Sequence, residues 1–308
     1  MLTVDHLRKD YGDLTAVRNL SFHLEKADIF GFIGPNGAGK TTTIKVCATL
    51  LEPTAGTVYV DGLDVTKHTT DVRGIIGYMP DFFGVYDDIM VWEYLDFFAA
   101  AYKIPRHRRK TIIDDVLELT DLGGKREAFV DALSRGMKQR LCLAKSLLHD
   151  PKVLLLDEPA SGLDPRARVE IKELLKELRA MGKTILVSSH ILPELADFCN
   201  KIGIIEQGEM VICGDVGEIM RKVQGGKALE ITLVDDCEKA VALLSQLPNI
   251  KGLKQTDKTV RVEFSTDEVD NSAILQMLIQ NGLRVASFTE SQVDLEDIFM
   301  KVTRGIVS

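Results

Sequence analysis

The stretch "GPNGAGKTT" at residues 34–42 limits the possible folds of this sequence more than any other segment. It satisfies the pattern G-x-x-x-x-G-K-[ST], it follows the strand-like run "DIFGFI", and a helical pattern begins at Lys40. In such a loop the glycines let backbone N–H groups converge on phosphate, and the N-terminus of the helix adds its dipole. The sequence therefore predicts a phosphate-binding loop between a strand and a helix of an α/β fold.

The residues of this loop have separate expected roles. We expect Lys40 to reach the β- and γ-phosphates, Thr41 to bind Mg²⁺, and Thr42 to donate a hydrogen bond to the α-phosphate. ATP and Mg²⁺ are therefore the expected ligands. The rest of the loop is expected to surround the phosphates, through Gly34, Asn36, Gly37, Ala38 and Gly39.

A second motif supplies two acidic residues. "VLLLDEP" at 153–159 is an apolar run that ends in two carboxylates, as expected of a buried strand that delivers acids to the carboxyl edge of a parallel sheet. We expect Asp157 to hold Mg²⁺ through water, and Glu158 to orient and deprotonate the attacking water. Two acids at the start of a surface loop would give the same pattern, but the phosphate loop favours the catalytic interpretation.

Composition and charge exclude several classes of protein. The 308 residues carry a net charge of -8, so the summed field disfavours a general binder of nucleic acid or anionic lipid. The five cysteines form no C-x-x-C pair, which suits a reducing compartment. The sequence has neither a signal-peptide core nor an apolar run of membrane-spanning length. We therefore expect any membrane span to belong to another chain.

The sequence pattern divides the chain into two domains. Residues 1–222 alternate short apolar runs with helical stretches, which is typical of an α/β domain, and about 82–150 reads as a helical insertion. The basic segment 105–109 fits a solvated helix start. Residues 227–308 follow the order β-α-β-β-α-β, which predicts a small ferredoxin-like α+β domain, and the segment "LEDIFMKVT" predicts a final amphipathic helix.

Three further motifs are weak alone but specific in their order. "LSRGMKQRL" places Ser134 at the N-cap of an amphipathic helix about 20 residues before Asp157. "SGLD" and "SSH" follow the Asp-Glu pair. With the phosphate loop and the helical insertion, this set resembles the nucleotide-binding subunit of an ATP-binding cassette (ABC) transporter over residues 1 to about 220. The resemblance implies a P-loop NTPase cassette fold.

The resemblance also implies a second copy of the cassette. In this family two cassettes pack head to tail, and each ATP lies between one phosphate loop and the partner's LSGGQ-like motif. By this likeness Ser134 and Gly136 would contact the γ-phosphate of the partner's ATP. Tyr11 would stack on adenine, Val17 would lie under the ribose, and His190 would touch the γ-phosphate as a catalytic residue beside Glu158 and Lys40.

Simpler roles for some of these residues stay open. Tyr11 could be an ordinary surface tyrosine, and His190 could have a local role at the end of a strand. Asp164, which the resemblance places at the dimer seam, could cap a helix before Pro165, and both roles can hold together. The C-terminal domain carries no evident ligand motif. Its role could be packing or dimer stabilisation, or it could act as a regulatory sensor.

The chain departs from the family pattern at two places. The motif usually written LSGGQ is Leu-Ser-Arg-Gly-Met at 133–137, which keeps the serine hydroxyl, the glycine amide and the helix dipole. Asp81, in "IGYMPD", stands where the family usually has glutamine. An extra anion beside two acids and a phosphate is costly unless Mg²⁺ shares it or the side chain turns away. Our hypothesis is that Asp81 supports Mg²⁺ through water.

The helical insertion, the LSRGM motif and the C-terminal extension resemble the ABC-2 export branch. That likeness implies a separate transmembrane permease, a second cassette subunit (a homodimer), no nucleic-acid partner, and a cytoplasmic location, peripheral on the inner face of the cell membrane. A cassette ATPase of translation or of DNA maintenance is the alternative. The single phosphate loop, the net charge of -8 and the short distance between the ATP motifs disfavour it.

Overall fold

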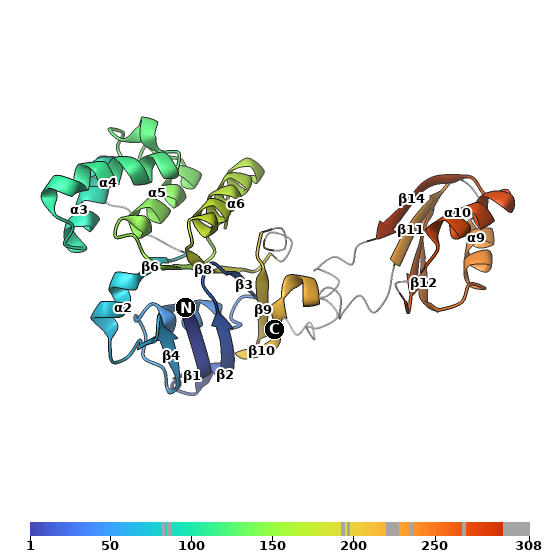
Figure 1. The fold of residues 1–308 in the computed structure, drawn as a ribbon, viewed down its shortest axis with the longest axis horizontal. Helices are drawn as coiled ribbons and strands as arrows, with labels where there is room; N and C mark the ends of the chain where they lie inside the picture. Colours follow the sequence, from blue (N-terminus) through green and yellow to red (C-terminus); the bar gives the residue numbers. More distant parts are fainter. Residues whose placement is uncertain are drawn as a thin grey trace. The chain divides into compact units, whose positions relative to one another are not determined.

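The computed structural model describes residues 1–81, 84, 88–191, 195, 198–219, 228–234, 237–266 and 269–291. The chain divides into two compact units, Met1–Val216 and Gly217–Ser308 (Figure 1). The first contains the phosphate loop and both acids of the Asp-Glu pair. Each unit is described by itself below.

The first unit is built on a ten-stranded sheet of order β5-β4-β1-β2-β10-β9-β3-β8-β7-β6. Its antiparallel part consists of β1 (Leu2–Tyr11), β2 (Leu14–Leu24), β4 (Ala55–Val60) and β5 (Leu63–Asp64). The part that carries the site is parallel, with β10 (Glu209–Asp215) antiparallel to its edge. The parallel strands are β3 (Ile29–Ile33), β6 (Ile76–Met79), β7 (Val153–Leu156), β8 (Thr184–Ser189) and β9 (Lys201–Glu206).

The central strands are buried on both faces. All residues of β3, β7 and β8 are buried, which explains why β3 and β7 are continuous apolar runs and why β8 contains one at 185–187. Because parallel strands end at the same edge of a sheet, the segments that follow these three strands meet there. These segments are the phosphate loop, the Asp-Glu pair and the residues after Ser189.

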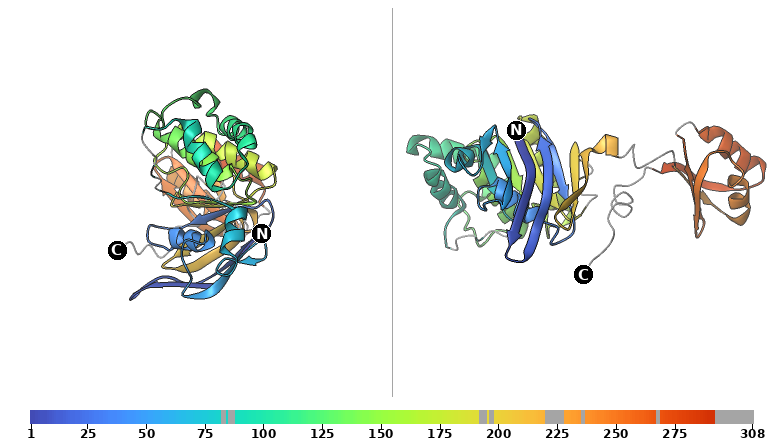
Figure 2. Two further views of the ribbon diagram at one scale, coloured as in Figure 1. Left: turned by 90° about the vertical axis from the view of Figure 1, so that its left-hand side faces the viewer. Right: turned by 90° about the horizontal axis from the view of Figure 1, so that it is seen from below.

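Helices cover the sheet and form the predicted insertion. Three helices lie between strands of the sheet in the chain. They are α1 (Lys40–Cys47) after β3, α2 (Thr69–Ile75) before β6, and α6 (Pro165–Ala180) between β7 and β8. Between residues 88 and 147 the regular elements are all helical: α3 (Val91–Ala101), α4 (Arg106–Leu119), the 3₁₀ turn η1 (Gly123–Lys125) and α5 (Arg135–Leu147). Helices α3, α4 and α5 gather at one end of the unit (Figures 1 and 2). The P-loop cassette fold with a helical insertion is confirmed.

The second unit has the predicted β-α-β-β-α-β order. Its four strands form an antiparallel sheet of order β12-β13-β11-β14, with a core of its own that includes Leu229, Val262 and Leu278. The expected amphipathic helix "LEDIFMKVT" lies outside the described residues. The elements are β11 (Ala228–Leu233), α9 (Cys237–Leu244), β12 (Ile250–Thr256), β13 (Thr259–Phe264), α10 (Asn271–Gln280) and β14 (Val285–Ser291).

The search for membrane-spanning helices gives a negative result. Among the described residues, no helix combines the length and the apolar character that crossing a bilayer requires.

We predict that Gly77→Ala destabilises the first unit while Gly74→Ala does not. A Cβ on Gly77, which is buried in β6, would lie 2.5 Å from the carbonyl oxygen of Ser146 and 2.7 Å from Leu154 Cδ2. Such overpacking should lower the free energy of unfolding by about 2–3 kcal/mol. Gly74, exposed in α2, has no neighbour within 4 Å of its added Cβ, so alanine there should stabilise by about 0.5–1 kcal/mol.

Thermal unfolding of both variants, followed by circular dichroism, checks this pair. Equal melting temperatures for the two variants would contradict the packing described for β6.

Candidate nucleotide site

The phosphate loop is held in place by close approaches of backbone to backbone. Gly34 directly follows β3, and a Cβ there would lie 2.3 Å from the carbonyl oxygen of Ile205. Gly39 precedes α1 with φ 107°, and a Cβ there would lie 2.6 Å from the carbonyl oxygen of Ala16. Only glycine fits both positions, so the loop lies directly on β9 and β2.

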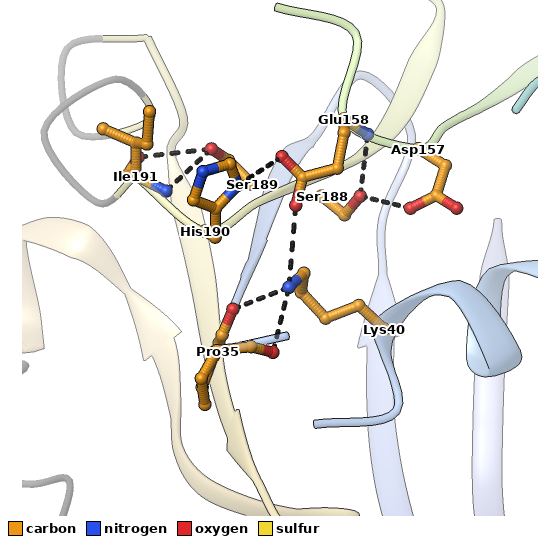
Figure 3. Close-up of polar contacts among 9 residues, drawn as sticks. Pro35, Lys40, Asp157, Glu158, Ser188, Ser189, His190 and Ile191 are labelled. Atoms are coloured by element: carbon orange, nitrogen blue, oxygen red, sulfur yellow. Dashed lines mark hydrogen bonds and ion pairs between the residues drawn. The ribbon is translucent and has the colours of Figure 1, made fainter. Parts of the chain in front are cut away.

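Lys40, the first residue of α1, is a buried cation at the centre of this loop. Its side chain is 6% exposed, and Nζ donates hydrogen bonds to the carbonyl oxygens of Gly34 (2.6 Å) and Pro35 (3.2 Å). Nζ also lies 3.6 Å from Glu158 Oε1 (Figure 3). Burial lowers the pKa of Lys40, while the charges of Glu158, Asp157 and Asp81 oppose that shift. The ammonium is therefore desolvated and able to meet a phosphate.

Asp157 has a carboxylate oxygen without a protein partner. The residue follows β7 and is 1% exposed; the Ser188 hydroxyl donates to its Oδ1 at 2.7 Å. No described residue donates a hydrogen bond to its buried Oδ2. Burial raises the pKa of Asp157, Asp81 and Glu158 raise it further, and the hydroxyls of Ser188 and Thr41 lower it. An unpartnered carboxylate oxygen among acids is a fitting ligand for a hard cation such as Mg²⁺.

Glu158 is held from three sides. Its backbone is in the left-handed region (φ 50°), and its N–H donates to the Ser188 hydroxyl at 2.9 Å. Its side chain is 12% exposed, with Oε1 facing Lys40 Nζ and Oε2 at 2.9 Å from His190 Nδ1 (Figure 3). An ionised carboxylate can only accept, so His190 donates through Nδ1–H. The three predicted catalytic residues thus form one connected row.

Lys40, Glu158 and His190 open into a cavity of about 470 Å³, whose lining does not include Gly34 or Asp157. Its lining includes eleven of the residues expected at the site: Tyr11, Asn36, Gly37, Ala38, Gly39, Lys40, Thr41, Thr42, Asp81, Glu158 and His190. Tyr11 is 44% exposed, as a ring available for stacking would be. Asp81 is exposed at the cavity wall.

Sequence reasoning missed several participants. Leu14, Ala16, Pro35 and Ser161 also line the cavity, and Ser188 holds both acids. The turn between β1 and β2 beside Tyr11 was a usable signal for Leu14 and Ala16. No comparable signal existed for Ser188, because its role depends on the pairing of β7 with β8.

Val17 and the LSRGM motif lie outside the cavity lining. Val17 has no exposed surface and packs beneath Gly39, so contact with a ribose would require its side chain to become exposed. Ser134 and Gly136 lie at the start of α5; the Ser134 hydroxyl accepts a hydrogen bond from Met137 N at 3.3 Å, which confirms the expected N-cap. These two residues do not join the site of their own chain.

Asp164 caps a helix. Its Oδ1 accepts a hydrogen bond from Ala167 N at 2.9 Å, with Pro165 in the first turn of α6. The cap that the sequence suggested is confirmed, while its place at a dimer seam stays a prediction.

Comparisons with known proteins agree with this geometry. Residues 17–161 match the family model described as ABC transporter, and residues 214–303 match the model for the C-terminal domain of DrrA1-3-like ATP-binding proteins. Over 307 residues the chain is 34% identical to the Nod factor export ATP-binding protein I of Ralstonia nicotianae, which covers 98% of this chain and 94% of the relative.

Two further matches extend this result. The bacitracin transport ATP-binding protein BcrA of Bacillus licheniformis is 35% identical over 304 residues, covering 97% of this chain and 96% of the relative. Among solved structures, a dimeric bacterial ABC transporter cassette, MJ0796, matches with a TM-score of 0.64 and 25% identity, over 70% of this chain and 99% of that chain.

We predict that Asp81→Asn raises the Mg²⁺ concentration needed for half-maximal ATP hydrolysis by about tenfold, the usual size of an effect on a supporting ligand. The reason is that Asp81 lines the cavity and its charge acts on both Asp157 and Lys40. A Mg²⁺ titration of ATPase activity measures the change. Asp88→Asn is the control, because Asp88 is exposed and outside the cavity lining. An unchanged titration curve for Asp81→Asn contradicts the hypothesis.

Proposed function

Because this chain belongs to the family of ATP-binding subunits of ABC transporters, we propose that it hydrolyses MgATP in the cavity described and drives export through a separate membrane permease. The observation that carries the proposal is the row Lys40, Glu158 and His190 at the mouth of the phosphate loop. This row places a cation, a carboxylate and an imidazole where the γ-phosphate and its attacking water would meet.

The chain's own residues divide the chemistry among them. Lys40 Nζ, now bound by two loop carbonyls and near Glu158 Oε1, can exchange these partners for phosphate oxygens. That exchange frees Glu158 Oε1 to accept a proton from water. During this exchange the hydrogen bond from His190 Nδ1–H to Glu158 Oε2 fixes the orientation of the Glu158 carboxylate.

The residues that would hold Mg²⁺ are Thr41, through its hydroxyl, and Asp157 and Asp81, each through water, with the unpartnered Oδ2 of Asp157 free to bind that water. When bound, the ion neutralises charge on the phosphates. Two observations support these residues as a Mg²⁺ site. The Oδ2 atom of Asp157 is buried without a hydrogen-bond partner, and the negative charges of Asp81 and Glu158 act on Asp157.

We propose a head-to-tail homodimer as the active form. Ser134 and Gly136 lie at the start of α5 and outside the cavity of their own chain, so they can serve only a nucleotide bound by another copy. The likeness to a cassette solved as a dimer supports this arrangement. Each chain would then supply the phosphate loop of one site and the helix N-terminus of the other, and the closing and opening of this dimer would move the permease.

The permease and the direction of transport rest on the relatives. Two of them are named for Nod factor export and for bacitracin transport. We propose that this chain likewise serves an exporter and lies peripherally at the inner face of the cell membrane, held there by its permease. The alternative, a cassette ATPase of translation or DNA maintenance, is not favoured.

We predict that Glu158→Gln reduces ATP hydrolysis about 100-fold or more, since the amide cannot accept a proton from water. The same variant should form an ATP-dependent dimer, because binding groups other than Glu158 stay intact. Phosphate release and light scattering in the presence of ATP measure the two effects. Glu52→Gln, at an exposed position outside the cavity lining, is the control and should behave as wild type. Full hydrolysis by a monomeric Glu158→Gln variant would refute the assigned base.

We predict that affinity capture of the tagged chain from detergent-extracted membranes recovers a multi-span membrane protein, identified by mass spectrometry. Recovery of ribosomes or of DNA in its place would support the alternative class and overturn the transporter proposal.

A further inference from the structure

The backbone of Glu158 depends on the turn that follows it. Ser161 N donates a hydrogen bond to the Glu158 carbonyl oxygen at 3.0 Å, and Leu163 N donates to the carbonyl oxygen of Ala160 at 3.3 Å. These bonds help to hold Glu158 in its left-handed conformation (φ 50°), which is unfavourable for a residue other than glycine. Since Ser161 also lines the nucleotide cavity, a shift of this turn would move the wall of the cavity and the carboxylate together.

Arg135, the first residue of α5, lies directly on this turn. A Cβ added to Gly162 would lie 2.3 Å from Arg135 Cζ and 2.4 Å from each of its two terminal nitrogens. The guanidinium therefore fills the space above the Gly162 backbone, where any other residue would place a side chain. The next residue of α5 continues the contact, since Gly136 faces Leu163 and Ala167.

The contact between Arg135 and Gly162 is one of shape rather than of charge. Arg140, further along α5, forms ion pairs with Asp121 and Glu170. In the described ranges, no carboxylate is paired with Arg135. A cation in the first turn of a helix also opposes the helix dipole, so neither an ion pair nor the dipole favours arginine here. The contact of the planar guanidinium with the Gly162 turn does account for an arginine at this position.

We propose that Arg135 is a positioning residue for Glu158 of the same chain. By stacking its guanidinium on Gly162, it fixes the Ser161 turn and keeps the Glu158 carboxylate between Lys40 and His190. This inference rests on the proposed role of Glu158 as the base. It gives the LSRGM motif a second task, because the helix start that carries Ser134 also supports the catalytic turn of its own chain.

Three substitutions at Arg135 separate stacking from charge. Glutamine keeps a planar group without charge, lysine keeps the charge without a planar group, and alanine removes both. We expect Arg135→Ala and Arg135→Lys to lower kcat about tenfold through misplacement of the base, with KM for ATP unchanged because the phosphate loop is intact. Arg135→Gln, whose planar amide is two bonds closer to the backbone than the guanidinium, should keep more of the wild-type kcat than alanine does.

Steady-state ATPase kinetics and thermal unfolding of the three variants provide the test. The inference is overturned if alanine keeps the wild-type kcat, if lysine keeps it, or if glutamine loses as much as alanine. Retention by lysine with loss by glutamine would show that the charge acts on the nucleotide instead. The thermal unfolding measurement guards against misfolding, because a variant that melts at the wild-type temperature and loses kcat has kept the fold.

Two comparisons keep this test apart from that of the proposed function. If Glu158→Gln leaves hydrolysis intact, the assigned base is wrong, whatever Arg135 does. If Glu158→Gln abolishes hydrolysis and Arg135→Ala leaves it intact, only the positioning role fails. Adding Arg135→Ala to Glu158→Gln should leave the ATP-dependent dimer as strong as before; a weakened dimer would place Arg135 at the partner's nucleotide and overturn the cis role.

Discussion

The site depends on the hydroxyl of Ser188, which links the ends of two neighbouring strands. It donates to Asp157 Oδ1 at 2.7 Å and accepts from Glu158 N at 2.9 Å. The parallel register that pairs Leu156 with Val187 brings the following residues, Asp157 and Ser188, side by side. One buried hydroxyl thus fixes both acids, so that Asp157 keeps a free oxygen while Glu158 is turned toward Lys40 and His190. The geometry of the candidate site is therefore set by strand pairing.

Much of the fold and part of the site could be predicted from the sequence because their signals are local. The phosphate loop, the buried strand before Asp157 and the β-α-β-β-α-β order of the second unit each occupy one continuous stretch. Ser188 and the contact of Arg135 with Gly162 could not be predicted. They join residues about 30 positions apart, and only the sheet order and the packing of α5 on the turn before α6 bring them together. Val17 is the opposite case: the resemblance places it under the ribose although its side chain has no exposed surface, and that role stays a prediction.

The LSRGM segment illustrates how one helix start can serve two sites. Its serine caps α5 in the expected way, its glycine packs against Leu163 and Ala167, and its arginine covers Gly162. In the proposed homodimer the same segment would meet the partner's nucleotide. The hydrolysis of one ATP would then depend on a helix whose packing also supports the base of the other site. In that arrangement a single chain would carry all the parts without bringing them to one nucleotide.

The head-to-tail arrangement is tested most directly by mixing two inactive variants. Lys40→Ala removes the phosphate-loop cation, and Ser134→Ala removes the serine offered to the partner. In a mixed dimer one site combines the intact phosphate loop of the Ser134→Ala chain with the intact Ser134 of the Lys40→Ala chain. The other site carries both substitutions. Random pairing at equal concentrations should restore roughly a quarter of the wild-type ATPase rate, because half of the dimers carry one intact site of two. A mixture no more active than the two variants measured separately would contradict the arrangement.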